Sequence, residues 1–311
     1  MISIIVPCYN EEDSIEPYLN ATLPVITRLN TDYEILFVND GSSDATLNKL
    51  KEVCQQNSNL KYINFSRNFG KEAALFAGLQ HASGDYIAVM DVDLQDPPQL
   101  LIEMYERLKQ NSDTDVVAAR RTDRKGEPFL RSMFSYAFYG IMNLISDTHM
   151  PQGVRDFRLM RKPVVEALLA ITEKNRFSKG LFVWVGFETE YIETKNIERE
   201  TGTTSWSFIQ LLKYSIDGVI NFSERPLDLA IFAGLITCVL SVMGLIVILV
   251  KTLMYGDPTP GWPSMVSIIM FLSGIQLLSI GIVGKYISKI FIETKERPIY
   301  IIKSSNLPKN N

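Results

Sequence analysis

Two aspartates separated by one residue, Asp91 and Asp93, carry the clearest chemical signal in the sequence. They directly follow an apolar run that ends at Met90, so they are expected at the end of a buried strand. Two carboxylates placed in this way can share a hard divalent cation and leave coordination positions for the phosphate oxygens of a ligand. Asp96 adds a third acid shortly after them. The spacing therefore predicts a Mg²⁺ or Mn²⁺ site that also holds a phosphorylated ligand.

Acidic residues also follow two earlier apolar runs. In the segment of residues 39–44, Asp44 is expected to cap the helix that comes next. Asp40 stands at the strand end itself, where its carboxylate can accept hydrogen bonds from a base or a ribose. For Glu11 and Glu12, a role at a helix N-terminus and a contact to a ligand both stay open, and we expect a mixture of the two.

Short β-branched runs alternate with amphipathic stretches of helical length through the N-terminal part of the chain. The runs expected to form strands are residues 2–6, 34–38, 61–65, 86–90 and 116–119. The stretches expected to form helices are residues 14–29, 45–56, 71–81 and 99–110. This alternation predicts a mainly parallel sheet with helices on both faces. Ligands of such sheets bind outside the carboxyl ends of the strands, which is where the polar segments described above are expected.

Composition excludes several classes of protein. The 311 residues carry a formal net charge of −4, which offers no positive field for nucleic acid. The three cysteines are odd in number and lack C-x-x-C spacing, which excludes a disulfide scaffold and a cysteine zinc site. The two histidines leave little for histidine-based metal chemistry. Motifs of the P-loop, of dinucleotide oxidoreductases and of α/β-hydrolases are absent from the sequence.

The chain changes character near residue 226. Residues 229–250 and 261–284 contain no Asp, Glu, Lys or Arg, and each stretch is long enough to cross about 30 Å of hydrocarbon as a helix. Basic residues gather before the first stretch and after the second, so the positive-inside rule places both chain ends in the cytoplasm. The N-terminal residues lack the basic region of a signal peptide. We therefore expect a large cytoplasmic part followed by two transmembrane helices.

Two further segments have apolar residues at helical spacing. Residues 208–219 fit either a core-packing helix or a helix on the membrane surface, and their position before the first apolar stretch favours the membrane surface. Residues 130–145 leave the same two alternatives open, with an oligomer contact as a third.

Seven segments resemble the GT-A glycosyltransferases of family 2. The first four are Ile-Ile-Val-Pro-Cys-Tyr-Asn-Glu-Glu, Val-Asn-Asp-Gly-Ser-Ser-Asp, Arg-Asn-Phe-Gly-Lys and Asp-Val-Asp-Leu-Gln-Asp-Pro-Pro, at residues 4–12, 38–44, 67–71 and 91–98. The later three are residues 153–160, 179–187 and 199–206. More narrowly, they are similar to polyprenyl-phosphate glycosyltransferases, which include dolichol-phosphate mannose synthase and the bactoprenol glucosyltransferases of O-antigen modification. The two apolar stretches match the bactoprenol branch.

The resemblance implies an inverting transfer of a hexose to undecaprenyl phosphate, with UDP-glucose as the favoured donor. Transfer of mannose, an N-acetylhexosamine or an amino-arabinose derivative is the alternative among enzymes, and a membrane-tethered nucleotide-sugar binder without turnover is the alternative outside them. A lipid phosphate is already ionised at neutral pH, so its oxygen can attack the sugar without a general base. The absence of a Q-x-x-R-W block disfavours a processive polysaccharide synthase. Whether the protein forms a homo-oligomer stays open.

The resemblance also assigns roles to individual residues. The implied ligands of Mg²⁺ or Mn²⁺ are Asp91, Asp93 and Gln95. Asp156 is implied as a third catalytic residue, beside Asp91 and Asp93, that contacts the donor sugar or the acceptor. Contacts to the nucleotide sugar are implied at Pro7, Tyr9, Glu11, Asp40, Lys71, Asp91, Val92 and Asp93, with Asp40 on the uridine. Contacts to phosphate, including that of the acceptor, are implied at Arg121, Arg124, Arg131, Arg158 and Arg199. Some relatives carry Lys at the position of Ser205, so no phosphate role is assigned there.

Four parts follow along the chain from these expectations. They are a GT-A domain over residues 1–206, a juxtamembrane amphipathic helix and linker over 207–226, two transmembrane helices over 227–290, and a cytoplasmic tail over 291–311. The expected location is the inner membrane, with several passes and with the catalytic domain and both termini in the cytoplasm.

Overall fold

The computed structural model describes residues 1–121, 151, 153–194, 225–255 and 261–308. The chain forms two compact units, of which one comprises Met1–Ser215 with Arg297–Asn311 and the other Ile216–Glu296. The strands described in the first unit are β1 (Ile2–Cys8), β2 (Tyr33–Asn39), β3 (Leu60–Phe65), β4 (Tyr86–Val89), β5 (Val116–Arg121), β6 (Val154–Arg161), β7 (Thr189–Thr194) and β8 (Ile302–Ser305). The helices described there are α1 (Ile15–Arg28), α2 (Thr46–Gln56), α3 (Lys71–His81), α4 (Leu100–Gln110), α6 (Lys162–Ala170) and α7 (Ser178–Trp184).

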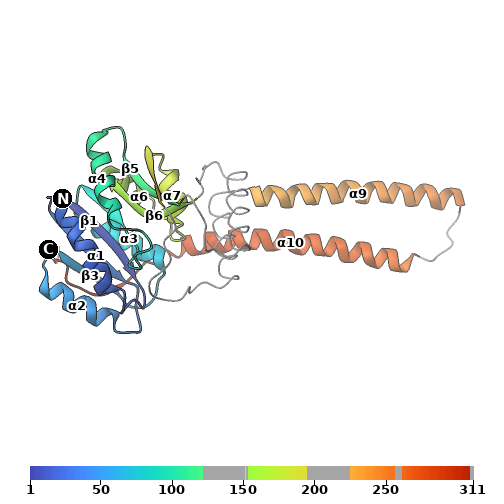
Figure 1. Cartoon of the computed structure of the whole chain (residues 1–311). Helices are drawn as coiled ribbons and strands as arrows, with labels where there is room; N and C mark the ends of the chain where they lie inside the picture. The colour runs from blue at the N-terminus through green and yellow to red at the C-terminus, as the bar shows by residue number, and fades with distance from the viewer. Residues whose placement is uncertain (122–150, 152, 195–224, 256–260, 309–311) are drawn as a thin grey trace. The chain divides into compact units, whose positions relative to one another are not determined.

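One sheet runs through the first unit in the order β7-β5-β6-β4-β1-β2-β3-β8 (Figure 1). β1 is parallel to β2 and β4, and β2 is parallel to β3. β6 is antiparallel to β4 and β5, and β8 is antiparallel to β3. The mainly parallel sheet and all the predicted strands and helices of residues 2–119 are confirmed. β6 and β8 run against the other strands, so their amino ends lie at the edge where the other strands end.

Helices cover both faces of this sheet, as the alternating pattern predicts. α1 contacts α2 and α4, whereas α3 contacts α6 and packs on β1 and β2. Successive residues of β1 point to opposite faces. Ile4 belongs to the apolar core that includes residues of α1, and Ile5 meets α3 at Gly78. A Cβ atom at residue 78 would come within 2.1 Å of the Ile5 side chain, so glycine is what allows α3 to lie this close to the sheet.

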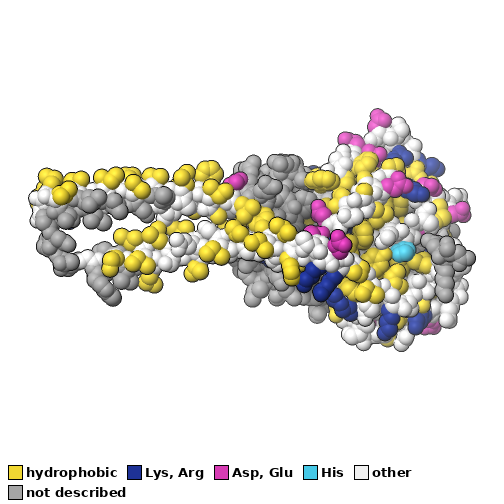
Figure 2. Space-filling view, turned by 180° about the vertical axis from the view of Figure 1, so that it is seen from behind, with side chains coloured by type: hydrophobic (Ala, Val, Ile, Leu, Met, Phe, Trp, Pro, Cys, Tyr) yellow, Lys and Arg dark blue, Asp and Glu magenta, His cyan; other side chains and the backbone are white. Residues whose placement is uncertain are grey.

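The second unit consists of two long helices in contact, α9 (Arg225–Tyr255) and α10 (Trp262–Thr294), whose exposed side chains are mainly apolar (Figure 2). Among the described residues, one segment is long and apolar enough to cross a membrane, Ile268–Thr294 with a mean hydropathy of 1.8. The apolar stretch Ala230–Gly244 of α9 is shorter. Within the described ranges there is therefore one candidate span where the sequence predicts two. The amphipathic segments predicted at residues 208–219 and 130–145 lie outside the described residues.

Candidate functional site

The reversed direction of β6 brings Asp156 to the carboxyl end of β4. Val89, the last residue of β4, pairs with Arg158 of β6. Because the strands are antiparallel, continuing this register sets Asp91 opposite Asp156. Asp93, with 8% of its surface exposed, follows in the same segment. The structure thus brings together the three residues that the sequence analysis assigns to catalysis.

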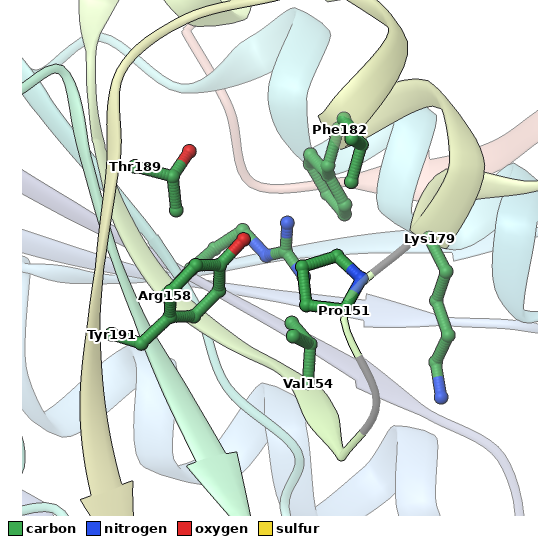
Figure 3. A pocket seen from close by; sticks show the side chains of 8 residues that line it. Pro151, Val154, Arg158, Lys179, Phe182, Thr189 and Tyr191 are labelled. Atoms are coloured by element: carbon green, nitrogen blue, oxygen red, sulfur yellow. The ribbon is translucent and has the colours of Figure 1, made fainter. Parts of the chain in front are cut away.

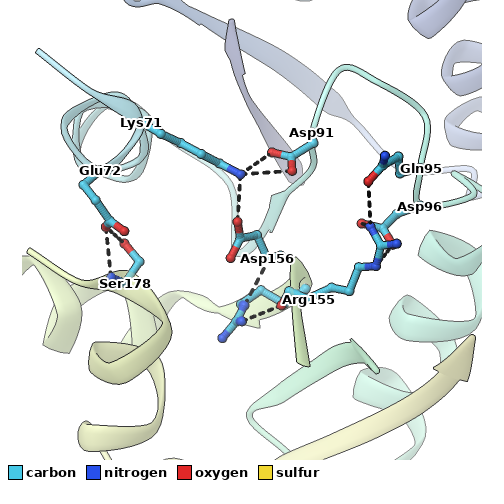
Figure 4. A network of polar contacts seen from close by, with 9 residues as sticks. Lys71, Glu72, Asp91, Gln95, Asp96, Arg155, Asp156 and Ser178 are labelled. Atoms are coloured by element: carbon cyan, nitrogen blue, oxygen red, sulfur yellow. Dashed lines mark hydrogen bonds and ion pairs between the residues drawn. The ribbon is translucent and has the colours of Figure 1, made fainter. Parts of the chain in front are cut away.

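Lys71, the first residue of α3, connects two of these carboxylates (Figure 4). Its ammonium lies 2.8 Å from Asp91 Oδ1 and 2.7 Å from Asp156 Oδ2. Burial lowers the pKa of Lys71, but the two carboxylates outweigh this effect and hold it above its ordinary value. Burial likewise raises the pKa of Asp156, and Lys71 with Lys179 outweighs it, so the pKa lies below the ordinary value. Lys71 and Asp156 are therefore both charged at neutral pH.

A second ion pair fixes the segment after Asp93. Arg155 Nε lies 3.2 Å from Asp96 Oδ1, and the same guanidinium donates to Gln95 Oε1 over 3.4 Å. Burial raises the pKa of Asp96 to about 6, although Arg155 opposes this shift. Leu94 has a φ of 55°, which is uncommon for a residue with a side chain, and Gln95 N donates to Asp93 Oδ1 over 3.2 Å. A held turn therefore positions Asp93 and Gln95.

The donor atoms in this segment fit a hard divalent cation. Within the described ranges, no three His, Cys, Asp or Glu side chains form a group that could hold a metal ion by themselves. Asp91, Asp93 and Gln95 supply oxygen atoms only, which is the ligand type that Mg²⁺ and Mn²⁺ prefer. Mg²⁺ in particular is commonly bound by one or two carboxylates together with substrate phosphates and waters. The residues present thus suit a cation that arrives with a phosphorylated ligand.

Asp40 holds the loop between β3 and α3. Its carboxylate accepts hydrogen bonds from Phe69 N over 2.6 Å and from Gly70 N over 2.9 Å, and 3% of its surface is exposed. Burial raises the pKa of Asp40, and these two N–H groups oppose the shift. Gly41, with a φ of 64°, lies so close to Arg67 that a Cβ atom would come within 2.3 Å of its carbonyl carbon. The end of β2 and the residue 66–70 loop are therefore fitted to each other.

The acids after β1 and β2 connect the two loops at their helix N-termini. Asp44 accepts from the backbone N–H of Thr46, the first residue of α2, although the N-cap position of that helix is held by Ala45 and not by Asp44 as predicted. Glu12 accepts from Ala45 N over 2.8 Å, and Glu11 accepts from the hydroxyl of Ser14 at the start of α1. Both glutamates thus accept hydrogen bonds at a helix N-terminus, which is one of the two roles that the sequence predicts for them, and the contact to a ligand stays a prediction.

The remaining predicted ligand contacts differ in accessibility. Pro7 lies within β1, Tyr9 just after it is 48% exposed, and Val92 is buried between the two aspartates. Arg121 is the last residue of β5, and its backbone N–H donates to the carbonyl oxygen of Gly153. Three further arginines with a predicted phosphate contact lie outside the described residues, namely Arg124, Arg131 and Arg199.

A pocket lies along β6 (Figure 3), where its lining residues Val154 and Arg158 stand two residues to either side of Asp156 in the strand. Its lining residues are Pro151, Val154, Arg158, Lys179, Phe182, Val183, Thr189 and Tyr191. Arg158 stacks on Phe182 at 3.6 Å and donates to the backbone carbonyl oxygens of residues 155 and 156. Burial lowers its pKa to about 10, which Asp156 opposes. Arg158 is therefore fixed in the wall of the pocket, with its charge retained.

Three residues of this site were not assigned from the sequence. Arg155 forms the ion pair with Asp96. Lys179 lines the pocket, and its charge lowers the pKa of Asp156. Glu72 accepts from the backbone N–H of Ser178 over 2.9 Å and from its hydroxyl, which holds the start of α7 against α3. Arg155 and Lys179 stand inside the segments 153–160 and 179–187, so those segments were the available signal.

Comparison with known proteins identifies relatives over almost the whole chain. The model of a family described as Glycosyl transferase family 2 matches residues 3–169. The protein CsbB of Bacillus subtilis (strain 168) is 44% identical over 308 residues, which cover 99% of this chain and 93% of the relative. An SfII prophage-derived bactoprenol glucosyl transferase of Shigella flexneri is 39% identical over 306 residues, or 98% of each chain. A crystal structure of glucosyl-3-phosphoglycerate synthase from Mycobacterium tuberculosis with Mn²⁺, UDP-glucose and phosphoglyceric acid aligns with a TM-score of 0.48 and 18% identity, over 70% of this chain and 76% of that chain.

Proposed function

The chain belongs to glycosyl transferase family 2 and is a glycosyltransferase, and from that premise we propose that it transfers glucose from UDP-glucose to undecaprenyl phosphate. The choice of acceptor and sugar is supported by the relatives named as bactoprenol glucosyl transferases, which align over nearly the full length, including the apolar C-terminal helices. The product is a lipid-phosphate-linked sugar that a later glycosylation step consumes.

The observation that carries the proposal is the network of Lys71, Asp91 and Asp156. It lies at the carboxyl edge of the sheet, where ligands of such sheets bind. We assign Asp91, Asp93 and Gln95 to the cation. A bound Mg²⁺ or Mn²⁺ would neutralise charge on the diphosphate as it leaves the sugar. We place the uridine near Asp40 and the residue 66–70 loop, since that loop lies beside the same edge.

An anionic acceptor explains the charge state of Asp156. Although burial raises it, the pKa of Asp156 is held low by Lys71 and Lys179, so its carboxylate is a weak proton acceptor at neutral pH. A sugar hydroxyl needs such a base, whereas a lipid phosphate carries at least one negative charge and attacks without one. The site is therefore better suited to a phosphate nucleophile, which it aligns with the anomeric carbon. Attack from the face opposite the diphosphate inverts that carbon.

The acceptor phosphate is assigned to the pocket beside Asp156. Lys179 and Arg158 line this pocket and supply positive charge next to the donor side of the site. Because the guanidinium of Arg158 is already held by two backbone carbonyl oxygens, Lys179 is the side chain that we assign to direct contact. Arg158 then contributes charge from the wall.

A lipid acceptor also calls for a chain that is anchored at the bilayer. We propose that α9 and α10 cross the inner membrane as a pair and that the catalytic unit and both termini face the cytoplasm. The apolar segment Ile268–Thr294 and the basic residues around the helices support this topology. The four-part division at residues 206, 226 and 290 is proposed with it, with the last part supplying β8 to the sheet of the first unit.

The decisive experiment is transfer of radiolabelled sugar into an organic-extractable lipid by the purified full-length protein. Candidate donors are nucleotides of glucose, mannose, N-acetylhexosamines and amino-arabinose, each presented with undecaprenyl phosphate in detergent. We expect transfer from UDP-glucose that requires Mg²⁺ or Mn²⁺ and is abolished in Asp93→Ala. Labelling from another donor would replace glucose with that sugar. Nucleotide binding without transfer by the unaltered protein would identify a binder in place of an enzyme.

A further inference from the structure

The segment that follows α10 returns to the sheet of the first unit and adds its edge strand beside β3. β8 is antiparallel to β3, with Ile63 paired to Ser305. The hydrogen bonds continue beyond the paired residues, because Asn306 Oδ1 accepts from Tyr62 N over 2.6 Å and Ser66 N donates to Ile301 O over 2.9 Å. The second of these bonds reaches the first residue of the loop that Asp40 holds.

Tyr300 joins the two elements that flank this loop. Its ring stacks on Phe65, the last residue of β3, with 5.0 Å between ring centroids and 17° between ring planes. Its hydroxyl donates to Gln80 Oε1 of α3 over 2.8 Å. Phe65 in turn meets the ring of Phe69 edge-on at 5.8 Å, and it is Phe69 whose backbone N–H binds Asp40. One side chain from the C-terminal segment thus contacts the strand that precedes the loop and the far end of the helix that follows it.

A row of buried amides makes a second connection. Ser304 of β8 accepts from Asn64 Nδ2 over 3.4 Å, and Asn64 Oδ1 accepts from Asn39 Nδ2 over 2.7 Å. Asn39 and Asn64 are 1% and 4% exposed, so the bond between these two amides is made away from water. Asn39 directly precedes Asp40. The C-terminal strand is therefore linked, through side chains of β3 and β2, to the residue next to Asp40, which binds the same loop.

From these contacts we propose that β8 and Tyr300 are positioning elements of the donor site, which hold the residue 66–70 loop in the geometry that receives the nucleotide. The loop is then ordered before the donor arrives, and binding does not have to supply the cost of ordering it. β8 is the next element after α10 in the chain. The helix assigned to the membrane is therefore covalently linked to the strand that holds the donor loop. This inference rests on the proposed function, since it takes the Asp40 loop as the wall of the nucleotide site.

The test compares Tyr300→Leu, which loses the ring and the hydroxyl, with Tyr300→Phe, which keeps the ring. The matched control is Tyr105→Leu, which removes a ring packed at 5.2 Å on Tyr86, the first residue of β4 and thus at the end of that strand opposite Asp91. UDP and GDP are titrated with Mg²⁺ into each full-length protein in detergent. Donor KM, kcat and amide hydrogen exchange of residues 66–71 are measured alongside.

For Tyr300→Leu we expect binding of the nucleotide about tenfold weaker and a donor KM raised to match, with kcat at saturating donor within about twofold of the unaltered protein. Exchange of residues 66–71 accelerates, and Tyr300→Phe has a smaller effect on all three quantities. Unchanged affinity in Tyr300→Leu, or an equal loss in Tyr105→Leu, would overturn the inference. If the unaltered protein binds neither UDP nor GDP, the proposed function fails instead, so the two failures are distinguishable.

Discussion

At the scale of single residues, Lys71 is an internal cation in the place where a metal site is proposed. Its ammonium neutralises Asp91 and Asp156, and 43% of its side chain is exposed, so solvent screens part of the interaction. Replacing it by methionine in Lys71→Met leaves two carboxylates without that counter-charge. We expect affinity for Mn²⁺ in the absence of nucleotide to rise about tenfold, because the internal competitor is gone. Calorimetric titration of Mn²⁺ measures this directly.

The same variant is expected to lose sugar transfer by roughly a hundredfold or more, since Lys71 also orients Asp156. Tighter metal binding together with lower activity distinguishes this role from simple damage to the fold. Lys109→Met is the matched control, because Lys109 lies over the ring of Tyr105 and away from the acidic residues. Equal or weaker Mn²⁺ binding by Lys71→Met would show that the lysine does not compete with the cation.

Gly41 is required by its backbone conformation and by its neighbours. Alanine in Gly41→Ala would adopt a φ near 64° and would place its Cβ atom 2.3 Å from the carbonyl carbon of Arg67. Gly70→Ala is the matched control, with a φ of 100° and open space around the added atom. We expect about 1–3 kcal/mol of destabilisation for Gly70→Ala from strain alone, and about 2 kcal/mol more for Gly41→Ala. Thermal melting of both proteins measures the difference, and equal melting temperatures would refute the steric argument.

At the scale of elements, local sequence pattern identified the parts of the site that follow parallel strands. Asp91 and Asp93 come directly after a buried run, so their place at the end of β4 could be predicted without knowledge of the fold. The position of Asp156 could not be derived in that way, because it depends on β6 pairing in reverse with β4. Only the resemblance of its segment to a family assigned it. Lys71 was predicted to contact the donor, and its ion pairs depend on the same long-range pairing.

The contacts that the sequence left out join elements far apart in the chain. Glu72 holds the start of α7 from across 106 residues, and Tyr300 reaches Gln80 across 220. Propensity and periodicity describe neighbours along the chain and carry no information on such pairs. β8 is also short and follows a long apolar helix. From local pattern alone, the residues around it are therefore predicted to be a polar tail. Its strand conformation follows from the free edge of β3 that it pairs with.

A buried carboxylate at the amino end of β2 gives the sheet a pH dependence. Glu34 accepts hydrogen bonds from Ser3, Lys61 and Ser83, and its side chain is 3% exposed. Burial raises the pKa of Glu34, but these donors outweigh it and hold the pKa below the ordinary value of 4.5. The folded state therefore binds fewer protons at this group than the unfolded state. Its stabilising contribution is present above pH 4.5 and is lost as the pH falls through the folded-state pKa.

Glu34→Gln is accordingly expected to cost about 2–4 kcal/mol at pH 7, because the buried donors lose their charged acceptor. The cost shrinks as the pH is lowered below 4.5. Glu103→Gln removes an exposed carboxylate paired with Arg107 on the same helix and is expected to cost less than about 1 kcal/mol. Melting temperatures of both variants at pH 7 and pH 4 test this. A Glu34→Gln deficit that stays constant between the two pH values would contradict the assignment.

At the scale of the whole molecule, the sheet contains residues from both sides of the helical unit. β1 to β7 precede α9 in the chain, and β8 follows α10. A single crossing of the membrane would put β8 and β3 on opposite sides of the bilayer and prevent their pairing. If the candidate span Ile268–Thr294 crosses, α9 must therefore cross as well, although its apolar stretch Ala230–Gly244 is short by composition. The pairing of β8 with β3 supports the two-span proposal more strongly than hydropathy does.

This topology predicts which side of the membrane each position occupies. Single cysteines are introduced as Tyr255→Cys at the end of α9 and Ser112→Cys on an exposed turn of the first unit. The third native cysteine, Cys238, is replaced by serine in both proteins, and the native Cys8 and Cys54 are buried, which limits their background reaction. In intact cells, a membrane-impermeant maleimide should label Tyr255→Cys, whereas Ser112→Cys should react only after the membrane is permeabilised. Protection of both positions in intact cells would mean that the helices lie on the cytoplasmic surface without crossing. That result would leave the sheet intact and remove the membrane-spanning role of α10.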